Sequence, residues 1–285
     1  MEAYTDFAGV YDIFMDDTPY EEWADFLVFL IEKYGISAPS VFHLEKGADS
    51  AGHTEEIREE ILKSERNLVL DLGCGTGTLT ELLYHKGYDM IGVDSSEDML
   101  SIALAKKEKS GSEILYLCQD MRELDLYCTI GTVVCVCDSV NYLLENEDVE
   151  DTFTLVHNYL YPGGIFIFDF NTVYKYEKVI GDTTIAENRE ECSFIWENYY
   201  HEEERINEYD LTIFAKEDSG LFRRFSETHF QRGYTLSEMT AFVEKAGMEV
   251  VIVLDADTHK EPREDSERIY VVARERGKAH EDTVI

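Results

Sequence analysis

The stretch that decides the fold is Leu68-Val69-Leu70-Asp71-Leu72-Gly73-Cys74-Gly75-Thr76-Gly77. An apolar run of strand character leads into three glycines within five residues, and a helical pattern follows. Glycine lets the backbone approach a ligand closely where a side chain would block it. A plain tight turn is the alternative, but three glycines weaken a helix start without a compensating purpose. The stretch therefore predicts a strand, a loop that cradles a ligand, and a helix.

Short apolar runs alternate with helical patterns on the carboxyl-terminal side of this loop. Such alternation predicts a parallel α/β sheet, and the unbroken apolarity of 132–136 places its strand at the centre. Runs at 249–254 and 268–273 would add an antiparallel edge pair. The predicted fold is a Rossmann-like α/β sheet of seven strands, mostly parallel. Its other strands are predicted at 67–71, 89–94, 114–119, 130–137 and 165–170, with helices at 77–86, 96–107 and 147–160.

Two regions differ from this pattern. Thr18 to Glu21 is typical of a helix start, with a capping hydroxyl and a proline in the first turn, and Gly35 offers a left-handed end. Residues 183–233 are aromatic and β-branched with period-two stretches, which predicts an antiparallel sheet of three or four strands. The predicted organisation is a helical cap and linker at 1–66, a Rossmann-like binding domain at 67–182 and 234–285, and the insert at 183–233.

The charge of the chain limits its partners. Its 285 residues include 60 acidic and 25 basic side chains, and the formal charge of −35 repels the phosphate backbone of nucleic acids. No apolar run approaches the ~20 residues of a membrane span. The six cysteines lack CxxC spacing, so we expect reduced thiols, a cytoplasmic location and no metal. Cys135 with Cys137 is the alternative metal pair, but alternate strand residues more often pack.

An acid stands at the end of each of the first four predicted strands, at Asp71, Asp94, Asp120 and Asp138. Ligands of open α/β sheets bind at the carboxyl ends of the parallel strands. Asp94 comes 17 residues after Gly77, where a carboxylate accepts both ribose hydroxyls of an adenosine. Capping of the next helix is the alternative role for Asp94.

The residues after the third strand and after the glycine loop indicate which adenosine cofactor is bound. Asp120 and Met121 are suited to the amino group and the ring of adenine, with a solvated turn as the alternative. A dinucleotide loop requires glycine or alanine where this chain has Thr78, and the dense spacing of the three glycines is that of adenosylmethionine enzymes. The sequence therefore predicts S-adenosylmethionine, with a nicotinamide-dependent reductase as the alternative.

These features and the Pro162-Gly163-Gly164 turn together resemble the class I S-adenosylmethionine-dependent methyltransferases over residues 66–172. Four further stretches resemble the bacterial YqeM-type methyltransferases, at 4–23, 195–200, 228–236 and 266–274, whereas the connection at 38–64 looks longer than theirs. The resemblance implies SN2 transfer of the sulfonium methyl group, which depends chiefly on alignment and needs no covalent intermediate. The predicted cofactor contacts are Tyr11, Asp71, Gly73, Cys74, Gly75, Gly77, Asp94, Ser95, Met99, Asp120, Met121, Cys137 and Asp138.

Three residues are candidates for catalysis. Tyr11 resembles the amino-terminal tyrosine that closes over the methionine end of the cofactor in related small-molecule methyltransferases, and Asn141 would face the transferable methyl group. His229 would serve as general base for an oxygen or nitrogen acceptor. Structural packing is the alternative for all three. The predicted substrate residues, aromatic and polar side chains of the insert, are Trp196, Tyr199, Gln231 and Arg232.

The acceptor is predicted to be a small molecule. Asp138-Ser139-Val140 lacks the paired prolines of enzymes that methylate amino groups of nucleic acids, and Val136 stands where cytosine-C5 enzymes have proline. A tRNA acceptor, a protein acceptor and a non-catalytic adenosylmethionine-binding protein are the alternatives.

Overall fold

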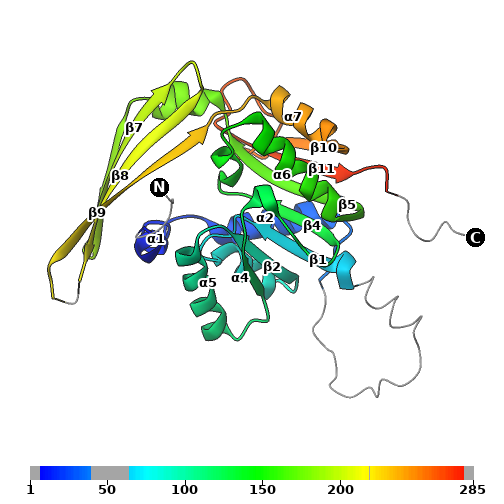
Figure 1. Ribbon diagram of the computed structural model, residues 1–285, viewed down its shortest axis with the longest axis horizontal. Coiled ribbons are helices and arrows are strands. Elements are labelled where there is room, and N and C mark those ends of the chain that lie inside the picture. The colour runs from blue at the N-terminus through cyan, green and yellow to red at the C-terminus, as the bar shows by residue number, and fades with distance from the viewer. Residues whose placement is uncertain (1–6, 40–63, 218, 279–285) are drawn as a thin grey trace, which may run out of the picture.

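The computed structural model describes residues 7–39, 64–217 and 219–278. The larger of its two sheets has seven strands (Figure 1), which are β1 (Leu68–Leu72), β2 (Asp89–Asp94), β3 (Leu115–Cys118), β4 (Ile130–Cys135), β5 (Leu160–Asn171), β10 (Met248–Asp255) and β11 (Arg268–Glu275). The smaller sheet has four, which are β6 (Thr184–Asn188), β7 (Cys192–His201), β8 (Ile206–Lys216) and β9 (Phe222–Arg232).

Helices cover both faces of the larger sheet. They are α2 (Tyr20–Tyr34), α4 (Thr78–His85), α5 (Glu97–Ser110), α6 (Asn146–Tyr159) and α7 (Leu236–Lys245). A further helix, α1 (Ala8–Phe14), packs on the smaller sheet, and the short helices are η1 (Met121–Glu123), η2 (Ser139–Tyr142) and the π-helix η3 (Lys175–Ile180). One apolar cluster joins the sheet to α6 and α7 through Phe153 and Val243. Another joins the opposite face to α2 and α4 through Leu27 and Leu83. The core therefore lies in two layers, one on each side of the strands.

The strand order is β10-β11-β5-β4-β1-β2-β3, and β11 runs antiparallel to both of its neighbours. This order confirms the predicted fold class, with a mostly parallel sheet and an antiparallel edge. β4 lies at the centre and all of its residues are buried, as its unbroken apolarity predicts. The order brings the carboxyl ends of β1, β2, β3 and β4 to one edge of the sheet.

β5 begins five residues earlier than predicted, at Leu160 rather than 165. The Pro162-Gly163-Gly164 turn lies inside this strand, where the pairing of β5 with β4 shifts register. Gly163 has a φ of +77°, which only glycine adopts readily. The sequence of this turn predicted a break before the strand, whereas the structure has a bulge within it.

The predicted caps of α2 are wrong. Pro19 occupies the N-cap position without a side-chain hydrogen bond, and the Thr18 hydroxyl contacts Met15 Sδ instead. Gly35 is extended, with φ −91° and ψ −176°, rather than left-handed. A Cβ at Gly35 would lie 2.9 Å from Cδ1 of Ile165, so glycine serves close packing against β5. The predicted connection at 38–64 lies almost entirely outside the described residues.

The smaller sheet is antiparallel throughout and carries α1 on its inner face. Val10 of α1 packs with Leu211 and Ile213, and the rings of Phe14 and Phe194 lie 4.8 Å apart. Figure 1 shows this sheet extending from the main body, with α1 between it and α5. Among the described residues, no helix has the length and apolar character needed to cross a membrane.

We expect Gly131→Ala to destabilise the protein by about 2 kcal/mol or more, because overpacking at such a site forces backbone shifts. A Cβ at Gly131, in the central strand β4, would lie 1.7 Å from the carbonyl oxygen of Arg66. Urea unfolding at equilibrium measures the change. Gly9→Ala in α1, where a Cβ would meet nothing within 4 Å, is the control and should not destabilise. Equal midpoints for the two variants would contradict the close packing at Gly131.

Candidate active site

A cavity of about 800 Å³ opens at the edge where the carboxyl ends of β1 to β4 meet. Its wall includes Tyr20 from the start of α2 and Tyr142 from η2. The structure brings eleven of the thirteen predicted cofactor residues together there, namely Tyr11, Asp71, Gly73, Cys74, Gly75, Asp94, Ser95, Met99, Asp120, Met121 and Cys137. Gly77 and Asp138 are not part of this wall.

The glycine loop is held open by the neighbouring strand. The backbone N–H groups of Gly73 and Cys74 both donate to the carbonyl oxygen of Val93, at 2.7 and 2.9 Å. Gly77 has a φ of +72°, and a Cβ there would lie 2.5 Å from the Tyr116 hydroxyl. Gly77 therefore allows the loop to pack closely against Tyr116 and does not line the cavity.

Asp94 ties the end of β2 to the same loop. Its carboxylate accepts hydrogen bonds from the N–H groups of Gly75 at 2.8 Å and Ser96 at 2.9 Å. Burial raises the pKa of Asp94, and these two amides oppose the shift. A carboxylate has about four acceptor positions, so capacity remains for two ribose hydroxyls. Ser96, whose hydroxyl accepts from Met99 N–H, is the side-chain cap of α5.

Asp71 and Asp120 are already engaged with the protein. Asp71 is buried at the end of β1 and accepts the Thr80 hydroxyl at 2.6 Å. Burial raises its pKa to about 7. Asp120 caps η1 and binds the Arg122 guanidinium at 2.6 Å, which lowers the pKa of Asp120.

The amino-terminal helix α1 is fastened over the glycine loop. Oδ1 of Asp12 accepts the Thr76 hydroxyl at 2.7 Å, and its Oδ2 lies 2.7 Å from Nζ of Lys106. Lys106 also donates to the Thr78 hydroxyl at 2.6 Å. These contacts hold Tyr11 in the cavity wall. The sequence patterns did not reveal Asp12 and Lys106, because nothing local distinguishes them from other surface charges.

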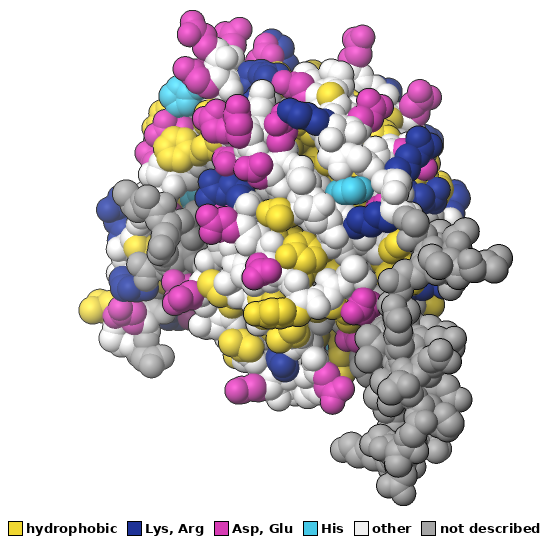
Figure 2. Space-filling view, turned by 45° about the vertical axis from the view of Figure 1, so that its right-hand side comes forward, with side chains coloured by type: hydrophobic (Ala, Val, Ile, Leu, Met, Phe, Trp, Pro, Cys, Tyr) yellow, Lys and Arg dark blue, Asp and Glu magenta, His cyan; other side chains and the backbone are white. Residues whose placement is uncertain are grey.

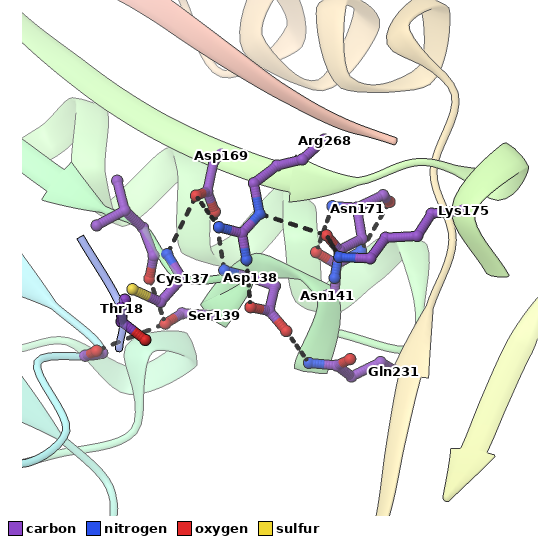
Figure 3. A network of polar contacts seen from close by, with 12 residues as sticks. Thr18, Cys137, Asp138, Ser139, Asn141, Asp169, Asn171, Lys175, Gln231 and Arg268 are labelled. Carbon is purple, nitrogen blue, oxygen red and sulfur yellow. Dashed lines mark hydrogen bonds and ion pairs between the residues drawn. The ribbon is translucent and has the colours of Figure 1, made fainter. Parts of the chain in front are cut away.

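A second polar network lies behind the end of β4 (Figure 3). Asp169 of β5 accepts from the N–H groups of Cys137 at 3.1 Å and Asp138 at 2.8 Å. Both of these residues have positive φ, which is uncommon without glycine. The Asp138 carboxylate accepts from Arg268 at 2.9 Å and from Gln231 at 2.6 Å. Burial raises the pKa of Asp169, and the nearby Arg268 guanidinium opposes this.

The remaining predicted residues are placed as follows. Asn141 is fully buried and donates to the carbonyl oxygens of Asn171 and Arg232, so its amide joins η2 to β5 and β9. Trp196 faces the inner side of the insert, 4.8 Å from the ring of Tyr209. Tyr199 is 44% exposed and follows Trp196 by an odd number of positions along β7, which places the two on opposite faces.

His229 lies beside the cavity rather than in its wall. Its Nδ1 is 3.2 Å from the hydroxyl of Tyr142, which does line the cavity. The Arg232 guanidinium donates to Leu144 O and Asn146 Oδ1, so it supports the loop after η2. Among the described residues, no group of three or more acidic, histidine or cysteine side chains lies together as a metal site.

Comparison with known proteins identifies the family. Residues 69–164 match the family described as a methyltransferase domain. A Bacillus subtilis protein whose name describes it as a methyltransferase, YqeM, is 32% identical over 95% of this chain and 96% of its own. This chain belongs to the S-adenosylmethionine-dependent methyltransferases. The resemblance to the YqeM type is thereby confirmed.

Two further proteins show the breadth of this methyltransferase family. A crystal structure of an S-adenosylmethionine-dependent methyltransferase from Clostridium acetobutylicum superposes with a TM-score of 0.76 at 27% identity, covering 97% of this chain and 100% of that one. A dTDP-3-amino-3,4,6-trideoxy-alpha-D-glucopyranose N,N-dimethyltransferase from Streptomyces venezuelae is 30% identical over 45% of this chain and 54% of its own.

The cavity of the methyltransferase fits its cofactor, S-adenosylmethionine. A Cβ at Gly73 would lie 2.6 Å from the Ser139 hydroxyl, so the tight passage between β1 and η2 depends on glycine. The half-buried Asp94 carboxylate and the Met121 thioether lie in the same wall. The site therefore offers acceptors for ribose and an apolar contact for a purine ring.

We expect Asp94→Ala to weaken S-adenosylhomocysteine binding about tenfold or more, since it removes charged hydrogen bonds to the ligand and loosens the loop at Gly75. Isothermal titration calorimetry measures the dissociation constant. Asp89→Asn, at the opposite end of the same strand, is the matched control and should bind as the unaltered protein does. Unchanged affinity in Asp94→Ala would remove Asp94 from the cofactor site.

The raised pKa of Asp71 predicts a pH dependence of stability. The folded state binds a proton at this carboxyl up to about pH 7, whereas the unfolded chain releases it near its ordinary value of 3.8. Asp71 ionisation therefore costs stability progressively as pH rises from about 4 to about 7, by about 4 kcal/mol in total. Asp71→Asn should gain stability relative to the unaltered protein across this range, measured by urea unfolding. Asp151→Asn, at an exposed position of α6, is the control. If the difference in unfolding free energy between Asp71→Asn and the unaltered protein did not change with pH, the raised pKa of Asp71 would be contradicted.

Proposed function

We propose that this methyltransferase transfers the methyl group of S-adenosylmethionine to a small molecule that binds between the cofactor, α1 and the insert at 183–233. The observation that carries the proposal is the size of the cavity beside α1. Helix α1 is bound beside it through the contacts of Asp12 with Thr76 and Lys106. One cavity of about 800 Å³ would hold both the cofactor and the acceptor. This volume is within the range of small-molecule sites.

The net charge of the chain and the name of one relative also support a small-molecule acceptor. The formal charge of −35 opposes a nucleic-acid partner, and acidic side chains are spread over the face shown in Figure 2. The Streptomyces relative is named for N,N-dimethylation of an amino sugar nucleotide. All six cysteines are free thiols, which supports a cytoplasmic location.

Each part of the wall has a proposed role. Asp94 binds the ribose hydroxyls, and Met121 contacts the adenine. Asp120 binds the adenine amino group. Tyr11 and the glycine loop enclose the methionine end, where the sulfonium supplies an electrophilic methyl group. The chain contributes alignment and exclusion of water, which is the main requirement of an SN2 transfer.

Asp138 and Asn141 take supporting roles in this proposal. The Asp138 carboxylate is bound by Arg268 and Gln231, and the Asn141 amide is bound to backbone. Both shape the turn that presents Ser139 and Tyr142 to the cavity. The domain boundaries we propose remain 67–182 with 234–285 for cofactor binding and 183–233 for the insert.

The acceptor class is tested by measuring S-adenosylhomocysteine release with three separate pools, containing cell metabolites, RNA or proteins. We expect release with the metabolite pool alone. Asp94→Ala is the control, because loss of cofactor binding should abolish the signal. Release only with RNA or protein would replace the small-molecule acceptor. Silence with all three pools, despite cofactor binding, would favour a non-catalytic binding protein.

A further inference from the structure

A chain of three ionisable side chains leads from the cavity wall into the insert. Oη of Tyr142 is 3.2 Å from Nδ1 of His229, and Nε2 of His229 is 3.3 Å from Oε2 of Glu227. We propose that Tyr142, His229 and Glu227 form a proton relay that removes the proton of the methyl acceptor. This inference rests on the proposed function and names the groups that make the acceptor nucleophilic.

Tyr142 is the end of the relay that meets substrate. It lines the same cavity as Gly73, Cys137 and Tyr11, where the methionine end of the cofactor is expected. Tyr142 is held there by η2, which follows directly from the turn fixed by Asp169. Its phenol is thus placed by the backbone rather than by a flexible loop.

The insert orients the middle of the relay. His229 and Tyr209 are direct partners across β9 and β8, and their rings stack with centroids 5.0 Å apart at an angle of 5°. The Tyr209 hydroxyl lies 2.7 Å from that of Tyr142. When Tyr209 donates to Tyr142, the proton of Tyr142 is directed to Nδ1 of His229.

Glu227 completes the relay in a buried position. Its exposed fraction is 6%, and that of His229 is 2%. The backbone N–H of Phe7 donates to Oε1 of Glu227 at 2.9 Å, which leaves Oε2 facing the imidazole. A buried carboxylate is costly unless it is bound or paired, and a protonated imidazole is the partner that would stabilise it most. The arrangement therefore places a buried carboxylate oxygen beside Nε2 of His229.

Three acids of the wall, Asp71, Asp94 and Asp120, are already bound by the protein and are less suited to this role. Asp71 is bound by the Thr80 hydroxyl, Asp94 by two backbone amides, and Asp120 by the Arg122 guanidinium. Tyr142 is connected through an imidazole to a buried carboxylate. General bases of this kind depend on a partner that stabilises the charge formed during the step.

The step balances without a further reactant. The acceptor atom forms a bond to the methyl carbon while the carbon–sulfur bond breaks, and the electron pair stays on sulfur as a neutral thioether. The proton of the acceptor passes to Oη of Tyr142 as the phenol proton passes to Nδ1 of His229. The imidazolium then lies beside the Glu227 carboxylate, and solvent takes the proton after release. Nδ1 of His229 must therefore be unprotonated beforehand.

The first test uses the metabolite pool as acceptor at saturating S-adenosylmethionine. Tyr142→Phe and His229→Gln should each lower the turnover rate about 100-fold or more, while calorimetry shows unchanged S-adenosylhomocysteine affinity. Glu227→Gln should lower turnover less, because it keeps the bond to Phe7. His201→Gln is the matched control, since His201 pairs with Glu208 at 2.8 Å on the same sheet outside the relay. Full turnover in Tyr142→Phe, the mildest change, would overturn the relay.

The second test needs no acceptor, so it separates the relay from the proposed function. Nitrogen-15 NMR of the histidine-labelled protein with S-adenosylhomocysteine bound, at pH 8, reports which ring nitrogen of His229 carries the proton. The relay requires protonated Nε2 and bare Nδ1, with Nδ1 shifting in Tyr142→Phe. Protonated Nδ1 would overturn the relay even if the metabolite pool is methylated. Unprotonated Nδ1 without S-adenosylhomocysteine release from the metabolite pool would support the relay geometry and overturn the proposed function.

Discussion

The candidate site depends on one carboxylate, Asp169, which binds two successive backbone amides at the end of the central strand. Those amides belong to Cys137 and Asp138, whose left-handed conformations would be strained without such a partner. The resulting turn aims Ser139 at the glycine loop and Tyr142 at the cavity. Loss of this carboxylate would disturb the cofactor wall and the acceptor wall together.

The amino-terminal segment unites the two sheets around that turn. Asp12 binds Lys106 and the hydroxyls of the glycine loop, and the backbone of Phe7 binds Glu227 of the insert. Arg189, between β6 and β7, bonds to Ile13 and Asp16 at the end of α1. In the proposed function, the segment from Phe7 to Asp16 therefore both covers the cofactor and binds the carboxylate of the proposed relay.

Local sequence patterns predicted the fold and the cofactor loop, because period and glycine spacing are properties of neighbouring residues. The place of Asp94 in the cavity wall was predicted for the same reason, since strand ends converge in any parallel sheet. Asp138 and Arg268 lie 130 positions apart, and Asp12 and Thr76 lie 64 apart, so no local pattern indicates their contact. Asn141 was predicted to face the methyl group from its place after the fourth strand, but a local pattern does not indicate that its side-chain amide donates to the carbonyl oxygens of Asn171 and Arg232.

The insert also has a consequence for synthesis of the chain. β5 pairs with β4 on one side and with β11 on the other, and the whole four-stranded sheet lies between β5 and β11 in sequence. During translation β5 therefore remains an open strand edge, rich in phenylalanine, until residues 268–275 leave the ribosome. Such edges attract other strands. Residues 184–232, which form the smaller sheet, must therefore be synthesised before β11 can close the larger one.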